Sequence, residues 1–137
     1  MNEEMYNKFL AQTRYGFLTT LRRDGSPTAV PVWFEWDGVA VRIFTSKTSS
    51  KVKRIQHDPR VTLLVANDLD EHEAWVAFDG TAIIEMEGGF ELAERLAHKY
   101  WDLADPERRA SLKSWRAVAD SFCVIVLQPA RVRSYWD

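Results

Sequence analysis

Two Asp-Gly pairs divide the first third of the chain into three β-rich runs. Asp24-Gly25 lies between residues 15–21 and 28–36, and Asp37-Gly38 separates 28–36 from 39–45. Asp-Gly between two such runs is a strong hairpin signal, because a tight hairpin turn needs residues that tolerate positive φ angles. Hairpins join antiparallel strands. This part of the sequence therefore predicts an antiparallel, mainly β architecture.

Strand and helix patterns follow one another along the rest of the chain. We expect helices over 2–13, over about 49–57 with a cap among Thr48, Ser49 and Ser50, over 90–103 and over 105–119, and strands over 60–66, 74–87, 121–128 and 131–136. Asp79-Gly80 predicts a bend or bulge inside 74–87, and Pro129 predicts a corner between the last two strands. About seven strands in this length predict a closed or half-closed barrel with helices over its ends.

Charge and composition exclude several classes of protein. The net charge is −2 and the pI about 5.9, which argues against nucleic-acid binding. No apolar run approaches the roughly 20 residues of a membrane span, and the acidic start is no signal peptide, so we expect a cytoplasmic protein without membrane contact. One cysteine, Cys123, excludes an internal disulfide, and it reads as inert core. The three histidines lack metal-ligand spacing, so no metal site is expected.

Hydroxyl and basic residues gather between the run 39–45 and the next predicted helix. Residues 45–51 read Thr-Ser-Lys-Thr-Ser-Ser-Lys, which places hydroxyls and Lys51 at a strand end and in a first helical turn. Backbone N–H groups lack partners there, and the helix dipole is positive. Such a helix start, with added Lys and Ser side chains, suits a phosphate group. The plain alternative is a Ser/Thr cap flanked by solvated lysines.

Pro31 lies inside the apolar run Val30-Pro31-Val32-Trp33-Phe34. Because proline cannot donate a ladder hydrogen bond, this run belongs at a sheet edge or an irregularity, where backbone groups are free to face a ligand. The alternative is an edge strand with buried aromatics.

Six aromatic residues suit either stacking on a planar cofactor or packing in the core or a subunit interface: Trp75, Tyr100, Trp101, Trp115, Tyr135 and Trp136.

Four sequence pieces occur in order within residues 16–65. They are an L-x-T…DG-x-P opening, PVWF, F-T-x(5)-K ahead of a helix, and DPRV leading into a strand. With them the chain resembles the pyridoxamine 5′-phosphate oxidase-like flavin-binding split-barrel proteins, above all their short flavin- or deazaflavin-dependent members. A weaker match continues through AWVAFDGTA and the closing PARVRSYW. Most of the chain is thereby covered.

The resemblance implies an antiparallel split β-barrel with flanking helices, forming one flavin-binding domain over residues 1–137. It also implies a homodimer whose two cofactor sites lie at the subunit interface, each built from both chains. The cofactor phosphate would contact Ser49, Ser50 and Lys51, with Thr45 and Ser46 on the phosphate or the ribityl arm. The ring would lie along the backbone of Val30, Pro31, Val32 and Trp33, with Trp75 beside it.

The function that the resemblance implies is an FMN-dependent oxidoreductase acting on a small-molecule substrate. The alternatives are a reductase that uses the deazaflavin coenzyme F420 and a non-catalytic flavin- or tetrapyrrole-binding protein. No residue pattern identifies a catalytic acid, base or nucleophile, and hydride transfer to a ring cofactor requires none. The oxidases' C-terminal substrate-binding segment has no counterpart here, so pyridoxamine phosphate is not the expected substrate.

Overall fold

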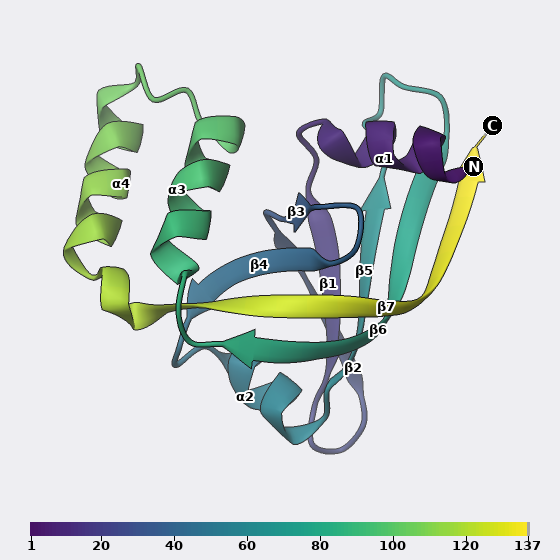
Figure 1. The fold of residues 1–137 in the computed structure, drawn as a ribbon, viewed down its shortest axis with the longest axis horizontal. Helices are drawn as coiled ribbons and strands as arrows, with labels where there is room; N and C mark the ends of the chain where they lie inside the picture. Colours follow the sequence, from purple (N-terminus) through teal and green to yellow (C-terminus); the bar gives the residue numbers. More distant parts are fainter. Residues whose placement is uncertain (137) are drawn as a thin grey trace.

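The computed structural model describes residues 1–136. Within this range, seven strands form one antiparallel sheet in the order β2-β1-β5-β6-β7-β4-β3. The strands are β1 (Gly16–Leu21), β2 (Pro27–Val32), β3 (Glu35–Trp36), β4 (Val41–Ser46), β5 (Arg60–Ala66), β6 (Ala74–Glu85) and β7 (Phe122–Trp136). Figure 1 shows that the sheet curls strongly. β2 and β3 are its two edge strands. The fold is a half-barrel flanked by helices, as predicted.

The helices of the described chain lie around this sheet. They are α1 (Glu3–Ala11), α2 (Ser50–His57), α3 (Gly89–Tyr100) and α4 (Pro106–Ala117), and the short 3-10 helix η1 (Ala119–Ser121) precedes β7. Figure 1 shows α1 and α2 at opposite ends of the half-barrel and the α3–α4 pair beside it. Side-chain caps start three of them: Asn2 accepts from the N–H of Met5, Ser49 from that of Val52, and Asp105 from that of Glu107.

The first predicted hairpin is confirmed and the second is only partly right. β1 and β2 pair across Asp24-Gly25 from Gly16↔Val32 to Leu21↔Pro27. The predicted strand over 28–36, however, breaks at Trp33–Phe34, and only β3 pairs with β4 across Asp37-Gly38. The break has a physical cause: the Phe34 side chain is fully buried in the barrel core, while Trp33 packs on the other side, among aromatic rings of the helices.

The last two predicted strands are one continuous strand, β7, so their separation was wrong. At Pro129 the strand has a register irregularity instead of an end: Pro129 pairs with Gly80 and Arg131 with Asp79, which leaves Ala130 without a partner on β6. β7 pairs with β6 from Glu85↔Val124 to Ala74↔Trp136, with a register shift at Asp79/Gly80 that confirms the predicted bulge. β4 covers the other side of β7 only as far as Leu127. From Pro129 onward β7 is therefore open on that side, and a residue without an N–H costs the ladder nothing there.

Alternating side chains fill the inside of the half-barrel. Its core includes Leu18, Ile43, Leu63, Phe78 and Ile125, all at most 1 % exposed. A second cluster lies on the outside of β4 and β7, where Val124 and Val126 pack against Leu92 and Leu96 of α3. Residues 123–127 are thus buried on both faces, which explains their nearly unbroken apolar sequence.

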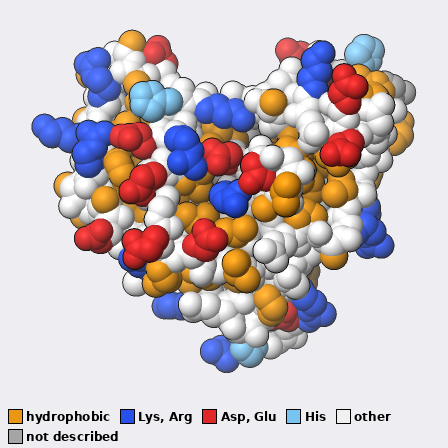
Figure 2. All heavy atoms as spheres, viewed as in Figure 1, with side chains coloured by type: hydrophobic (Ala, Val, Ile, Leu, Met, Phe, Trp, Pro, Cys, Tyr) orange, Lys and Arg blue, Asp and Glu red, His pale blue; other side chains and the backbone are white. Residues whose placement is uncertain are grey.

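An aromatic cluster fastens the α3–α4 pair to the sheet. Trp33, Phe44, Tyr100, Trp101, Trp115 and Phe122 form a connected set of ring contacts with centroids 4.9–6.2 Å apart. The core interpretation is therefore right for three of the aromatic residues singled out in the sequence: Tyr100, Trp101 and Trp115. On the face seen in Figure 2, charged side chains of both signs gather over the α3–α4 side, and Arg95–Glu35 and Arg116–Glu94 are ion pairs there.

A buried arginine holds the acidic loop at residues 67–73. Arg14 is 4 % exposed; its Nη1 lies 2.5 Å from Glu71 Oε1 and its Nη2 lies 2.7 Å from Oε2. Its Nε donates to the carbonyl of Phe9 at the end of α1. The hydrogen bond from Arg14 lowers the pKa of the Glu71 carboxyl to about 2. The sequence predicted this loop but gave no sign of its anchor.

Candidate cofactor site

The start of α2 presents a cluster of polar groups. β4 ends at Ser46, whose Oγ lies 3.0 Å from Thr48 Oγ1, and the turn leads to Ser49. Ser49 is the helix cap: its Oγ accepts from the N–H of Val52 at 3.3 Å. Ser50 and Lys51 follow in the first helical turn. The structure therefore brings together four of the predicted phosphate ligands: Ser46, Ser49, Ser50 and Lys51.

This helix start is chemically fitted to a phosphate group. Within residues 1–136, the backbone N–H groups of Ser50 and Lys51 have no hydrogen-bond partner. The Lys51 side chain is half-buried and makes no ion pair in this part of the chain. Burial, and then the positive charge of Arg54, lower the pKa of Lys51. An anion at this position would satisfy both N–H groups and offset the unfavourable charge at Lys51.

Thr45 has a different environment from its neighbours. It pairs with Cys123 in the β4–β7 ladder and is 8 % exposed, on the inner face that Val41 and Ile43 also occupy. Cys123 is itself fully buried, as predicted, and burial raises the pKa of its thiol. The Thr45 side chain is therefore part of the barrel interior, one residue before the polar cluster.

The proposed ring-contacting segment forms an edge of the sheet. β2 has one neighbour, β1, so the backbone groups on its other side have no strand partner among the described residues. This confirms the edge position that Pro31 predicts. Val30 and Val32 pair with Leu18 and Gly16 and face inward, whereas Pro31 is exposed opposite Phe17. The Trp33 side chain packs in the aromatic cluster, so only its backbone remains for a ligand.

Trp75 lies far from the start of α2 within one chain. It pairs with Ala66 and Tyr135 where β6 begins, whereas α2 leads into Arg60, which pairs with Thr81 farther along β6. At about 3.3 Å per residue, Trp75 and Thr81 are roughly 20 Å apart. Figure 1 shows α2 and the loop before β6 at opposite ends of the half-barrel. Within one chain, Trp75 is therefore not part of the polar site at the start of α2.

The convex side of β1, β5, β6 and β7, here called the outer sheet face, carries polar and apolar side chains in register. One row across it reads Phe17, Leu64, Ala77 and Arg133, and the next reads Thr19, Thr62, Asp79 and Arg131. Two shallow cavities of about 340 and 380 Å³ lie on this face and share Thr19 and Thr62. Phe17 and Leu64 are 43 % and 39 % exposed. The face is thus partly apolar and hollowed.

Asp79 is the electrostatic centre of the outer sheet face. Its carboxylate accepts from Thr62 Oγ1 at 2.8 Å and from Arg133 Nε at 2.6 Å, and Arg131 lies 3.4 Å away. The hydrogen bond from Arg133 is the main cause that lowers the Asp79 pKa to about 2. These contacts tie β5 and β7 to β6 beside the bulge.

One contact and one cavity near α2 have no signal in the sequence. Arg54 Nε donates to Thr20 Oγ1 at 2.7 Å, and Thr20 is 1 % exposed. Arg23, in the β1–β2 turn, lies at the same cavity as Arg54. The basic residues of α2 were visible as a charge cluster, but their pairing with the hairpin depends on how the helix packs across the barrel end.

A family model described as pyridoxamine 5′-phosphate oxidase matches residues 3–136. The chain belongs to the pyridoxamine 5′-phosphate oxidase family. This membership agrees with the half-barrel, the edge strand at Pro31 and the polar start of α2. It confirms the family and the split-barrel fold that the sequence motifs indicated, and members of this family typically bind a flavin.

Solved structures of several other proteins have the same fold as this chain. An F420 reductase is 25 % identical, with a TM-score of 0.76, over 93 % of this chain and 94 % of the other. A conserved hypothetical protein from Mycobacterium tuberculosis is 26 % identical, with a TM-score of 0.75, over 100 % and 85 %. A heme binding protein from Mycobacterium smegmatis is 26 % identical, with a TM-score of 0.66, over 97 % of this chain and 53 % of its own.

Two searches give negative findings. A search of curated proteins finds no match to this sequence. Among the helices of residues 1–136, none combines the length and apolar character that a membrane crossing requires.

Proposed function

We propose that this family member is a flavin-binding oxidoreductase that holds FMN by its phosphate at the start of α2. The observation that carries the proposal is the polar cluster there. Among the described residues, the N–H groups of Ser50 and Lys51 lack a hydrogen-bond partner and Lys51 makes no ion pair, and the Ser46 and Ser50 hydroxyls lie in the same segment. When bound, the isoalloxazine ring supplies hydride chemistry toward a small-molecule substrate.

The chain's own part in this function is binding and orientation. Lys51 supplies a positive charge at the phosphate, and the cap at Ser49 fixes the direction of the helix N–H groups toward it. The open backbone edge of β2 from Val30 to Trp33 offers N–H and carbonyl groups to the ring, interrupted at Pro31, which has no N–H. The aromatic cluster holds Trp33, and with it this backbone segment, in place.

We further propose that the active form is a homodimer formed through the outer sheet face. Phe17, Leu64 and Tyr135 leave apolar surface exposed there, on strands that are otherwise well packed. Contiguous apolar surface of this kind marks an association site. The position of Trp75 at the other end of the half-barrel from α2 supports the same idea, because Trp75 would then complete the site of the partner chain.

Coenzyme F420 is the second candidate cofactor. The observation that favours it is the similarity to an F420 reductase over nearly the whole of both chains. FMN and F420 share a phosphate-bearing ribityl arm, so the same helix start suits either. The two differ in ring and tail, and a binding measurement separates them directly.

The decisive experiment is a titration of the ligand-free protein with FMN and, separately, with F420, followed by the fluorescence of each ring. Saturable binding of one, at one per chain, supports the proposal and names the cofactor. Added haemin is the third ligand, because of the similarity to a heme binding protein. Binding of haemin with no binding of either flavin would overturn the oxidoreductase proposal.

A further inference from the structure

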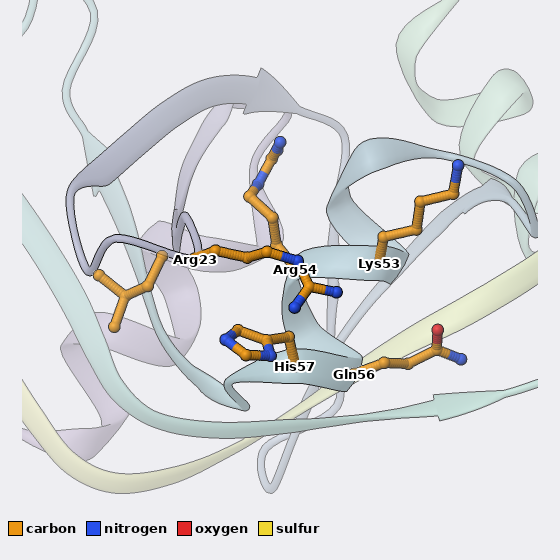
Figure 3. A pocket seen from close by; sticks show the side chains of 6 residues that line it. Arg23, Lys53, Arg54, Gln56 and His57 are labelled. Carbon is orange, nitrogen blue, oxygen red and sulfur yellow. The ribbon is translucent and has the colours of Figure 1, made fainter.

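A basic cavity lies between α2 and the β1–β2 hairpin, outside the proposed cofactor site. Its volume is about 470 Å³, within the usual range of small-molecule sites. It is lined by Leu21 at the end of β1, Arg23 in the hairpin turn, and Lys53, Arg54, Gln56 and His57 on α2. Figure 3 shows these side chains around the cavity, with Arg23 reaching over from the hairpin toward the helix. We call this site the basic cavity.

The basic cavity holds three permanent positive charges and no carboxylate among its lining residues. The acidic side chains next to it in sequence are already engaged. Asp24 accepts from the N–H and hydroxyl of Ser26, and Asp58 forms an ion pair with Arg60 at 2.8 Å. Within the described chain, Arg23, Lys53 and Arg54 make no ion pair. No carboxylate of residues 1–136 therefore lies within ion-pair distance of these three cations.

Arg54 is held in a fixed position at the wall of the basic cavity. Its Nε donates to the buried hydroxyl of Thr20 at 2.7 Å, and its two terminal nitrogens have no partner among residues 1–136. A guanidinium fixed by one nitrogen presents the others as a preorganised fork for an oxyanion. Complementarity to the helix dipole would account for Arg54 and His57, which lie in the last turn of α2. It does not account for Lys53 or for Arg23, which comes from the hairpin.

We propose that the basic cavity binds a diphosphate group, either as free diphosphate or as part of a nucleotide. Three permanent charges from two elements match the charge of a diphosphate, and the two guanidinium groups suit its oxygens. The volume exceeds what one phosphate fills, and Leu21 gives one apolar wall for the remainder of a ligand. This activity goes beyond the proposed oxidoreductase function and does not depend on it.

The basic cavity and the start of α2 are different anion sites. The cofactor phosphate is assigned to N–H groups at the first turn, whereas the basic cavity uses side chains from Lys53 onward. The last turn of a helix offers carbonyl oxygens rather than N–H groups, so an anion there depends on side-chain cations. Arg54 also acts on Lys51 through its charge, so the cations to remove in a test of the basic cavity are Arg23 and Lys53.

Titration calorimetry on the full chain at constant ionic strength tests the proposal, with inorganic diphosphate and ADP as the probes. In the Lys51→Ala background, which weakens anion binding at the start of α2, we expect one site per chain, and at least about tenfold weaker binding of both probes once Arg23→Ala/Lys53→Ala is added. Both residues have exposed side chains, so the fold should persist, which circular dichroism verifies. Tighter binding of ADP than of diphosphate supports a nucleotide as the source, and equal binding supports free diphosphate.

Two control variants make the result decisive. The variant Arg109→Ala/Lys113→Ala removes two exposed charges from α4 and should bind both probes as the wild type does. Lys51→Ala should also keep diphosphate binding. The proposal is overturned if the wild type shows no saturable binding, or if the α4 variant loses as much affinity as the cavity variant. It is equally overturned if Lys51→Ala alone abolishes binding, because the anion would then lie at the start of α2.

Discussion

Trp33 and Tyr100 stack almost in parallel, with ring centroids 4.9 Å apart and planes 13° from parallel. The Tyr100 hydroxyl donates to the carbonyl of Arg14 at 2.5 Å and accepts from the N–H of Phe34 at 3.4 Å. This one side chain thus joins α3, the segment before β1 and the crossing between β2 and β3. It also fixes the segment whose backbone we assign to the flavin ring.

Replacing Tyr100 by Phe tests this role of the hydroxyl. The ring stack remains, but the Phe34 N–H and the Arg14 carbonyl lose a partner in a half-buried place. We expect a loss of about 1 kcal/mol in the free energy of unfolding, measured by urea denaturation. Tyr15→Phe is the matched control, because Tyr15 is 59 % exposed and lies beside the Tyr100 ring. An equal effect of both variants would contradict the assignment.

Local signals explain which parts of the fold the sequence predicted. Asp24-Gly25 forms the predicted hairpin because a tight turn between two strands depends on a few neighbouring residues. Nothing local marks the crossing at Trp33–Phe34, since residues 30–36 look like one strand and only packing sends its halves to opposite sheet edges. A related reason explains why Pro129 does not end the strand: the cost of a proline depends on whether a strand lies on its N–H side, and the local sequence does not contain that information.

The candidate site was predictable to a similar degree. Ser46, Ser49, Ser50 and Lys51 come from one short segment, so motif and helix chemistry indicated the same place. The basic cavity was not predictable, because Arg23 and Arg54 meet only through the packing of α2 against β1, which the Thr20 hydrogen bond records. Trp75 remains a prediction, since its role depends on a partner chain.

Gly80 permits the bulge that aligns β6 with β7. A Cβ on Gly80 would lie 2.1 Å from the carbonyl oxygen of Gln128, which is backbone and cannot move aside. We expect Gly80→Ala to cost about 3 kcal/mol of unfolding free energy. Gly25→Ala separates this steric effect from backbone strain, because Gly25 has φ +84° and open space around it. That variant should cost about 1 kcal/mol. Equal losses in thermal or urea unfolding would contradict the clash.

Asp79 should make stability depend on pH in the acid range. Its pKa is lowered from 3.8 to about 2, so the unfolded chain takes up the proton at a higher pH than the folded chain. Its stabilising contribution is therefore complete above the unfolded pKa and is lost as the pH falls from about 4 to 2. The variant Asp79→Asn should show a flatter pH profile of unfolding than the wild type at equal protein concentration. Parallel profiles would exclude this contribution.

The homodimer proposal predicts the effect of a charge on the outer sheet face. Leu64 pairs opposite Phe17 at the centre of the exposed apolar row, so Leu64→Glu would bury a carboxylate at the interface. We expect light scattering to show a dimer for the wild type and a monomer for Leu64→Glu, together with weaker flavin binding. Val39→Glu, at a 77 % exposed position in the β3–β4 turn, should remain a dimer. A wild type that is monomeric at micromolar concentration would refute the proposal.

Lys51 carries the sharpest prediction for the cofactor site. Lys51→Ala removes the one cation assigned to the phosphate and should weaken FMN binding by about 1.5–3 kcal/mol, the contribution of a charge-assisted hydrogen bond. Lys51→Arg keeps the charge and should recover much of the affinity. Lys113→Ala, on an exposed face of α4, is the neutral control. An unchanged dissociation constant for a folded Lys51→Ala protein would move the phosphate away from the start of α2.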